Sequence, residues 1–281
     1  MKHRIISILL CIALFVGASH ASLNITGDGT DNIAVTNVAD IQDENAWTMI
    51  WWWRWATSFN DFGRLAGKGT GAANEISVAF SANLANGLDV KQNTDNTDLS
   101  QRIGSLSIDT DDTWQYLAVT MNLANGAGDV VDIYYGNLTT VVTLDGTDGT
   151  ADGNSNEGAA TLYVGNNRNL SNFGLGGDVA MFQYWNKEMS LGEIRKQQYH
   201  PHFDANCQIF FFPGFQGATT VADFSGNGNT GTGTGTTIAN PVPLGPPFGF
   251  SNSTDWVLPW VWAQQGMNKY GFLQRALMLR M

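Results

Sequence analysis

Aromatic and basic side chains are concentrated in the segment WTMIWWWRW at residues 47–55, and this composition suits contact with a sugar. A pyranose ring has an apolar face and hydroxyl edges, so its binding site needs an aromatic platform with polar neighbours. In a strand, Trp52 and Arg54 share one face. We take both as candidate carbohydrate-binding residues, with Tyr134 and Tyr184 as neighbours on other strands. The alternative is that these aromatic rings belong to the core.

Oxygen-rich turns are the second feature that could do chemistry. The segments GDGTDN (27–32), GGD (176–178) and LDGTDGTADGNSNEG (144–158) gather Asp, Asn and Glu side chains. Hard cations such as calcium prefer several oxygen ligands. The same side chains also shape turns by bonding to their own backbone, which is the alternative role. Structural calcium is therefore the candidate cofactor, and the sequence indicates no other.

Groups that could catalyse bond cleavage do not occur at workable spacings. A retaining glycosidase needs two carboxylates about 5 Å apart, and the segments 75–80, 178–185 and 188–193 each lack a second carboxylate at that spacing. The G-x-S-x-G nucleophile elbow is also absent. His200 and His202 flank Pro201 in a linker, and we expect them to be solvated. We therefore expect no catalytic residues, and an unconventional glycoside hydrolase or lyase is the least favoured alternative.

The charge balance and the N-terminal segment bound the partners and the compartment. The chain has 14 basic and 25 acidic residues, a net charge of −11, and such a surface repels nucleic acid. Residues 1–21 combine Lys2 and Arg4 with an apolar run and small residues up to Ala21, the parts of a signal peptide cut after Ala21. The mature chain keeps a single cysteine, Cys207, so we expect no internal disulfide. These features predict a secreted or cell-surface protein.

Period-two alternation of β-branched and aromatic residues recurs along the chain, with turn clusters between the runs. Besides 47–55, such runs lie at 75–80, 114–121, 130–135, 139–144, 160–164, 178–185 and 208–212. One short helix is predicted, because Ser190 and Glu193 have the spacing of a capping box and Pro201 ends the segment. About a dozen short strands with one helix predict an all-β, two-sheet antiparallel jelly-roll sandwich.

The C-terminal segment has a different composition. The Pro-rich linker PVPLGPPFGF (241–250) is followed by an aromatic and basic tail that has no acidic residue after Asp255. The simpler interpretation packs this tail on its own sandwich. The alternative docks it on a membrane or a partner, since Trp and basic residues suit an interface. Membrane contact is expected only through this tail.

Six motifs follow one another between Leu23 and Tyr199: AWTMIWWWRW, GRLAGKG, TWQYLAVTMN, VDIYYGNL, TLYVGNN and GGDVAMFQYWNKEMSLGEI. This series resembles the laminin-G-like branch of the concanavalin A-like lectin/glucanase superfamily. Met181 stands where an acid is usual, and Gly136–Asn137 departs from the usual hairpin order. TTVADFSGNGNTGT (219–232) resembles a turn that commonly starts such domains. We therefore expect a permuted jelly roll in which this late segment lies beside the N-terminal strand.

The resemblance carries expectations about the site and the function. It implies a structural ion between the loop of the first strand and a late strand, which would involve Asp28 and Asp178. It implies a secreted, non-catalytic binding module for carbohydrate or a surface partner. The alternative is a structural adhesin that decorates a surface or particle through its C-terminal tail. The expected organisation is a signal peptide at 1–21, a jelly-roll domain at 22–240, and the linker with its tail at 241–281.

Overall fold

The computed structural model of the chain describes residues 22–239 apart from short internal segments. The segments left undescribed are 26–29, 37, 39–40, 56–62, 70–74, 82–86, 97–98, 104–112, 126–127, 152, 157, 167–173, 175 and 214–217. The predicted signal peptide, linker and tail therefore lie outside the described residues. No helix within the described part is long and apolar enough to cross a membrane.

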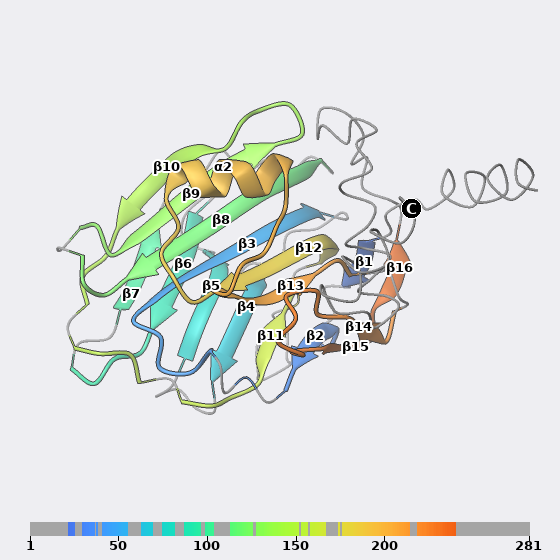
Figure 1. Ribbon diagram of the computed structural model, residues 1–281, viewed down its shortest axis with the longest axis horizontal. Helices are drawn as coiled ribbons and strands as arrows, with labels where there is room; N and C mark the ends of the chain where they lie inside the picture. Colours follow the sequence, from blue (N-terminus) through green and yellow to red (C-terminus); the bar gives the residue numbers. More distant parts are fainter. Residues whose placement is uncertain are drawn as a thin grey trace, which may run out of the picture. The chain divides into compact units, whose positions relative to one another are not determined.

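One antiparallel sheet of eight strands, sheet A, has the order β10-β9-β8-β3-β12-β1-β16, and β13 pairs with β12 beyond the end of β1. Figure 1 shows its strands in front, crossed by the helix. Its strands are β1 (Ser22–Ile25), β3 (Ala46–Trp55), β8 (Trp114–Asn122), β9 (Val131–Asn137), β10 (Thr143–Asp148), β12 (Gly177–Trp185), β13 (Cys207–Phe211) and β16 (Thr237–Ala239).

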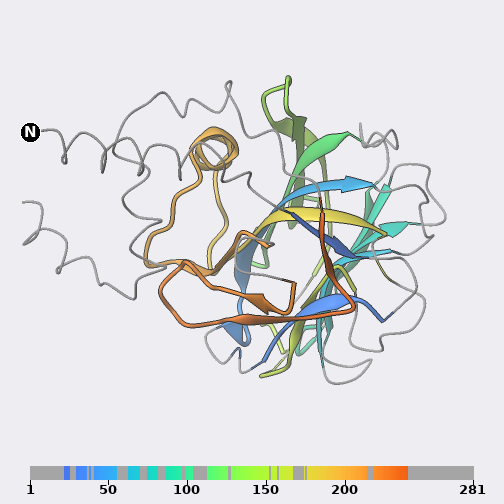
Figure 2. The same cartoon turned by 90° about the vertical axis from the view of Figure 1, so that its right-hand side faces the viewer.

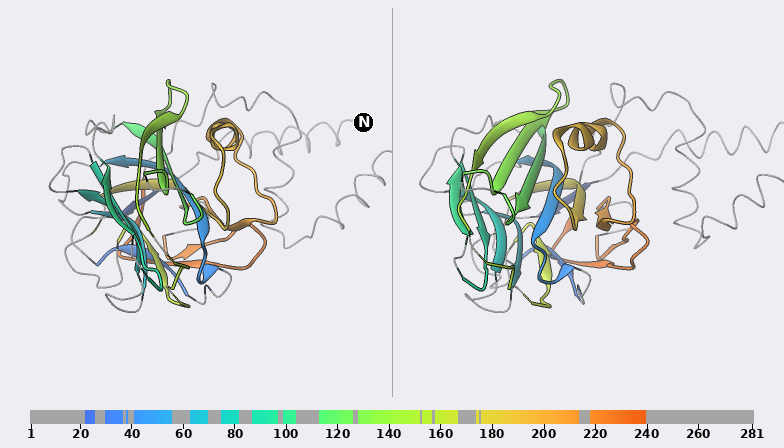
Figure 3. Two further views of the ribbon diagram at one scale, coloured as in Figure 1. Left: turned by 90° about the vertical axis from the view of Figure 1, so that its left-hand side faces the viewer. Right: turned by 60° about the vertical axis from the view of Figure 1, so that its left-hand side comes forward.

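A second antiparallel sheet of eight strands, sheet B, has the order β14-β15-β2-β11-β4-β5-β6-β7. Its strands are β2 (Asn32–Val35), β4 (Arg64–Gly69), β5 (Glu75–Ser81), β6 (Gly87–Gln92), β7 (Leu99–Ile103), β11 (Leu162–Val164), β14 (Thr220–Val221) and β15 (Gly231–Thr234). Figures 2 and 3 show the two sheets as facing layers. The predicted all-β antiparallel sandwich is confirmed.

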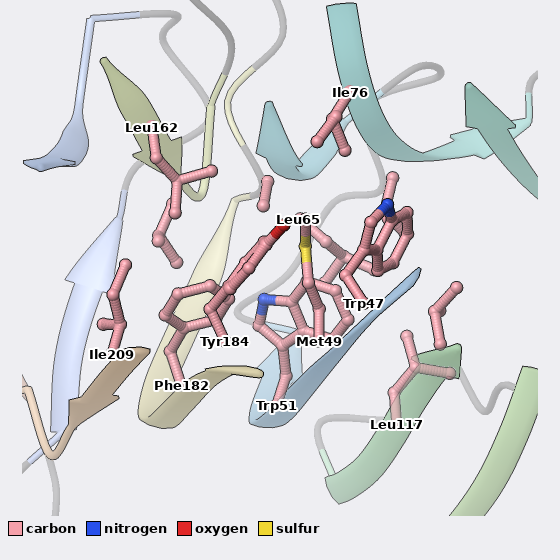
Figure 4. Packing of buried hydrophobic residues seen from close by; sticks show 14 of the residues in the cluster. Trp47, Met49, Trp51, Leu65, Ile76, Leu117, Leu162, Phe182, Tyr184 and Ile209 are labelled. Atoms are coloured by element: carbon pink, nitrogen blue, oxygen red, sulfur yellow. The ribbon is translucent and has the colours of Figure 1, made fainter. Parts of the chain in front are cut away.

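The core lies between the two sheets and is built by the period-two alternation of the strands. Along β3, Trp47, Met49, Trp51 and Trp53 all belong to the buried cluster between the layers (Figure 4). The ring of Trp51 packs on that of Phe182 from β12, with centroids 5.7 Å apart. Burying each such side chain stabilises the fold by about 1.5–3 kcal/mol. The face of β3 predicted for Trp52 and Arg54 is therefore the outer face of sheet A.

The one helix of the described residues, α2 (Leu191–Tyr199), begins as the capping-box spacing predicts. The backbone N–H of Glu193 donates to the Ser190 hydroxyl, and the Glu193 carboxylate accepts from the Ser190 backbone N–H at 2.8 Å. Helix α2 lies on the side of sheet A that faces away from sheet B (Figures 2 and 3). It buries Ile194, Gln197 and Gln198 against that outer face.

Two buried glutamines fasten α2 to sheet A. The amide nitrogen of Gln198 donates to the carbonyls of Asn137 (3.0 Å) and Thr140 (2.9 Å), and its amide oxygen accepts from the Val142 N–H at 2.8 Å. The amide oxygen of Gln197 accepts from the Gln183 side chain on β12 at 3.1 Å. Because buried polar groups must be hydrogen-bonded to be tolerated, these bonds define where the helix lies.

The late part of the chain meets the N-terminal strands, as the permutation predicts, but the segment 219–232 itself lies beside β2 and not beside the first strand, β1. Strand β16 pairs with β1 in sheet A, with Ser22 opposite Ala239, and β15 pairs with β2 in sheet B. The Gly–Thr alternation of β15 has a packing reason. A Cβ at Gly231 would lie 2.6 Å from Ile33, and one at Gly233 would lie 2.2 Å from the Ala218 carbonyl oxygen. Glycine thus occupies the inner positions, and the threonines between them are exposed.

One predicted strand is displaced along the chain. The run 139–144 was expected to be a strand, but β10 begins at Thr143. The reason is local: the side-chain oxygen of Asn137 accepts from the backbone N–H groups of Thr139 (2.9 Å) and Thr140 (2.8 Å), which closes a turn. The Val142 N–H, which follows this turn, donates to the Gln198 side chain on α2 and does not pair with a strand.

Candidate functional site

The structure joins one sugar-binding candidate and one calcium candidate in an ion pair. Arg54 on β3 lies opposite Asp178 on β12, and its guanidinium donates to Asp178 Oδ2 from Nη2 and, at 3.1 Å, from Nε. The Asn24 amide of β1 donates to Asp178 Oδ1 at 2.8 Å. The Arg54 guanidinium also lies over the Trp114 ring, 5.3 Å from its centroid. This cluster therefore ties β1, β12, β3 and β8 together.

The geometry around Asp178 bears on the predicted calcium ion. The carboxylate is only 2% exposed, and both of its oxygens already accept hydrogen bonds from Arg54 and Asn24. Arg54 supplies the positive charge that an ion would provide, so Asp178 as placed does not fit the role of calcium ligand. Within the described residues, no group of three or more His, Cys, Asp or Glu could hold a metal. Asp28 lies outside the described residues, so its part of the prediction stays a prediction.

The burial of Trp52 and Tyr184 corrects their assignment as a sugar platform. Trp52 is 1% exposed and packs edge-on against Tyr116, with ring centroids 5.2 Å apart. The Tyr116 hydroxyl donates to the Ile194 carbonyl of α2 at 3.0 Å, so the helix covers this pair. Tyr184 is fully buried and points between the sheets (Figure 4). Neither ring presents a face to a ligand.

Tyr134 and Arg54 are the remaining sugar-binding candidates. Tyr134 lies on the outer face of sheet A but is only 6% exposed, and its hydroxyl donates to Asp132 at 2.9 Å. Burial, and then the hydrogen bond to the Asp132 carboxylate, raise the pKa of Tyr134 well above its usual value. Arg54 keeps a side-chain exposure of 22% but is held by Asp178. The outer face of sheet A is thus occupied largely by internal contacts.

The outer face of sheet B has a different character. Across β11, β4, β5 and β6, the strand register places Tyr163, Gly67, Ser77 and Lys91 in one row. Their chain neighbours, including Val164 and the apolar residues of β5 and β6, belong to the core. The row therefore points away from the core. Its two large side chains stand at the ends, and its two smallest residues are in the middle.

Arg64, Ser77, Asp89, Lys91 and Tyr163 form what we call the sheet B site. Arg64 lies in the adjacent row, and its Nη1 donates to the buried Ser77 hydroxyl at 2.7 Å. Asp89 stands two residues before Lys91 on the same face of β6. The side chains of Lys91 and Tyr163 are half-buried and make no hydrogen bond, ion pair or ring contact with any described residue.

The chemistry available at the sheet B site is recognition. It holds an aromatic ring, hydroxyl, guanidinium and ammonium donors, and one carboxylate. Glycosidases use a pair of carboxylates, and the site as defined holds one carboxylate, Asp89. Ser77 and Asp89 are buried, so the groups of this site that can meet a ligand are the half-buried side chains of Tyr163, Lys91 and Arg64.

Sequence reasoning missed this site, and of its strands it predicted only those at 75–80 and 160–164, not β4 or β6. The motifs GRLAGKG and TLYVGNN contain Arg64 and Tyr163, and period-two alternation could have separated the outward residues from Leu65 and Val164. Alternation alone does not say which of the two outer faces a helix covers. That is decided by the contacts of α2.

Comparisons with known proteins support the fold. No protein-family model matches the chain, and no curated protein matches its sequence. A candidate carbohydrate-binding protein from Bacteroides ovatus aligns with a TM-score of 0.52 and 15% identity over 81% of this chain and 62% of that chain, so the match spans less than two thirds of it.

Two further solved structures align over shorter parts of the chain. The CBM40 module of the Ruminococcus gnavus IT-sialidase gives a TM-score of 0.45 and 11% identity, over 62% of this chain and 94% of the module. Domains LG4-5 of the mouse laminin alpha1 chain give a TM-score of 0.40 and 8% identity, over 60% of this chain and 43% of that chain. The alignment with the Bacteroides ovatus protein shows that the two chains share a fold, and an antiparallel β sandwich is the fold that the resemblance predicted.

Proposed function

We propose that the protein is a secreted, non-catalytic module that binds glycans through the sheet B site. The observation that carries the proposal is the pair Tyr163 and Lys91, whose side chains have no partner among the described residues although both stand on a rigid sheet. An aromatic ring beside hydrogen-bonding groups matches the apolar face and hydroxyl edges of a sugar. Strands hold such groups more firmly than loops do.

Two further observations support this assignment. Helix α2 covers the outer face of sheet A, whereas no described helix lies on sheet B (Figures 2 and 3). The fold is also that of the candidate carbohydrate-binding protein from Bacteroides ovatus. Secretion is supported by the predicted signal peptide, since β1 begins at Ser22, directly after the predicted cleavage point.

A glycan array probed with the full mature chain tests the proposal, followed by calorimetry on the glycans that bind. Tyr163→Ala is expected to weaken binding about tenfold or more, which corresponds to about 1.4 kcal/mol. Phe203→Ala is the matched control, because Phe203 is an aromatic residue that is 45% exposed, lies after α2 and packs against Phe210 of sheet A. An array without bound glycans, or equal losses for the two variants, would contradict the proposal.

The alternatives named from the sequence have separate tests. Release of reducing sugar from any glycan that binds would support the glycoside hydrolase or lyase and would contradict the non-catalytic assignment. The surface- or particle-decorating adhesin depends on residues 241–281, which lie outside the described residues. We therefore do not propose it as the function.

A further inference from the structure

The sequence contains the pattern Asn-x-Ser/Thr, with a residue other than proline in the middle, at Asn24, Asn137, Asn169 and Asn252. In a secreted protein this pattern is the acceptor for N-linked glycosylation. Asn169 and Asn252 lie outside the described residues. The structure therefore bears on Asn24 and Asn137, and the amide nitrogens of these two side chains have different surroundings.

Asn137 is the last residue of β9 and opens the turn to β10. Its Oδ1 accepts from the backbone N–H groups of Thr139 and Thr140 and, at 3.0 Å, from the Thr139 hydroxyl. Its Nδ2 makes no hydrogen bond with any described residue. The oxygen of this amide thus closes the turn, and the nitrogen, which is the atom that carries an N-linked glycan, has no partner in the described part of the chain.

The turn is accessible and is closed by local contacts. Asn137 is half-buried, Thr139 and Thr140 are exposed, and Figure 3 shows the turn between β9 and β10 projecting from the sandwich. The bonds to Oδ1 join residues two or three positions apart, so they can form before distant strands are in place. Asn137 is therefore available both in a growing chain and in the folded protein.

Asn24 is bound at the corresponding atom. Its Nδ2 donates to Asp178 Oδ1 at 2.8 Å, and Asp178 is only 2% exposed. Strand β1, which contains Asn24, lies between β12 and β16 in sheet A. A glycan on Asn24 would have to fit against this buried carboxylate, so we expect the folded protein to carry none there.

We propose that Asn137 is an acceptor site for N-linked glycosylation. The donor is an oligosaccharide joined through a pyrophosphate to a lipid. Asn137 Nδ2 forms a bond to the anomeric carbon, and the bond from that carbon to the pyrophosphate oxygen breaks. The lipid pyrophosphate leaves with the bonding electrons, the amide nitrogen loses one proton, and no group is oxidised or reduced. Because Oδ1 takes no part, the turn keeps its hydrogen bonds.

This inference rests on the secretion that the proposed function includes, and not on the sheet B site. The test expresses the full chain in cells whose secretory pathway transfers lipid-linked oligosaccharides to asparagine. A second version carries a leader of the host cell in place of residues 1–21, so that it enters the pathway independently of the predicted signal peptide. Peptide mass mapping of the secreted protein, before and after enzymatic release of N-linked glycans, identifies the occupied asparagines. We expect a glycan on Asn137 and none on Asn24.

Thr139→Val removes the hydroxyl of the acceptor pattern and should abolish the modification of Asn137, while Thr139→Ser should retain it. Thr140→Val is the matched control, because Thr140 is the next exposed threonine of the same turn and lies outside the pattern. Thermal melts check that each variant is folded.

An unmodified Asn137 in the secreted protein, or equal occupancy of Asn137 and Asn24, would overturn the inference. Equal losses for Thr139→Val and Thr140→Val would also overturn it. Secretion of the version with the host leader alone would contradict the secretion in the proposed function, and that version would still decide whether Asn137 is modified.

Discussion

The attachment of α2 through Gln198 gives the sharpest prediction for stability. Gln198 is fully buried and makes three hydrogen bonds to the turn between β9 and β10. Gln198→Ala removes all three. The Val142 N–H is buried and would stay unsatisfied, which costs about 1–3 kcal/mol. The Asn137 and Thr140 carbonyls lie nearer the solvent and can be rehydrated, so each lost bond adds about 0.5–1 kcal/mol. The expected loss is about 2–5 kcal/mol.

Urea denaturation followed by tryptophan fluorescence measures this loss. Lys196→Ala on the exposed side of the same helix is the control, and it should change the free energy of unfolding by less than about 0.5 kcal/mol. A loss at Gln198 no larger than that of the control would show that α2 is not held by this side chain, and the account of the covered sheet A face would be refuted.

Gln198→Glu adds a check on the direction of the hydrogen bonds. The new carboxylate would face the Asn137 and Thr140 carbonyls, which cannot donate to it. Burial among acceptors should raise the pKa of this carboxyl in the folded state. Stability is then retained below the unfolded-state pKa and lost as the pH rises through the folded-state pKa. The deficit relative to wild type should therefore be larger at neutral than at acidic pH. A pH-independent deficit would contradict the assigned donors and acceptors.

Two further predictions concern charged groups. Asp178→Asn should lower the free energy of unfolding by about 1–3 kcal/mol, because it leaves the Arg54 guanidinium without its charged partner. The loss should be the same with and without a chelator. A loss confined to chelator-free buffer would show that Asp178 binds calcium. Burial raises the pKa of Glu193, but hydrogen bonds from Lys187 and Ser190 outweigh this and lower it to about 2. Because the folded-state pKa is depressed, Glu193 stabilises α2 at pH values above the ordinary glutamate pKa of 4.5, and this contribution is lost as the pH falls from 4.5 to about 2. Denaturant titrations across this pH range measure the difference in free energy of unfolding between wild type and Glu193→Gln. This difference should shrink as the pH falls, and a constant difference would show that the Glu193 carboxylate does not stabilise α2.

Local patterns in the sequence were sufficient for several elements. The alternation of Trp47, Met49, Trp51 and Trp53 predicts a strand with one face in the core, because side chains of a strand alternate at every residue. The capping box that starts at Ser190 involves residues three apart, so it too can be predicted locally. The permuted end was likewise predictable, from the order of the motifs.

The candidate site depends on contacts between residues far apart in the chain. Trp52 and Arg54 share a face with the residues that α2 covers, and the helix is placed there by Gln198, more than 140 positions later. Asp178 and Arg54 were assigned to different sites, yet they pair across neighbouring strands.

Sequence alone determined the fold class, the strand faces and the helix start, since these follow from the conformations and side-chain directions of neighbouring residues. Only the tertiary structure decided which outer face carries the helix and that Tyr163 and Lys91 lie on the other one. The physical reason is that burial and pairing depend on which strands become neighbours. The alternation of apolar and polar residues along a strand is the same whether or not a helix covers its outer face.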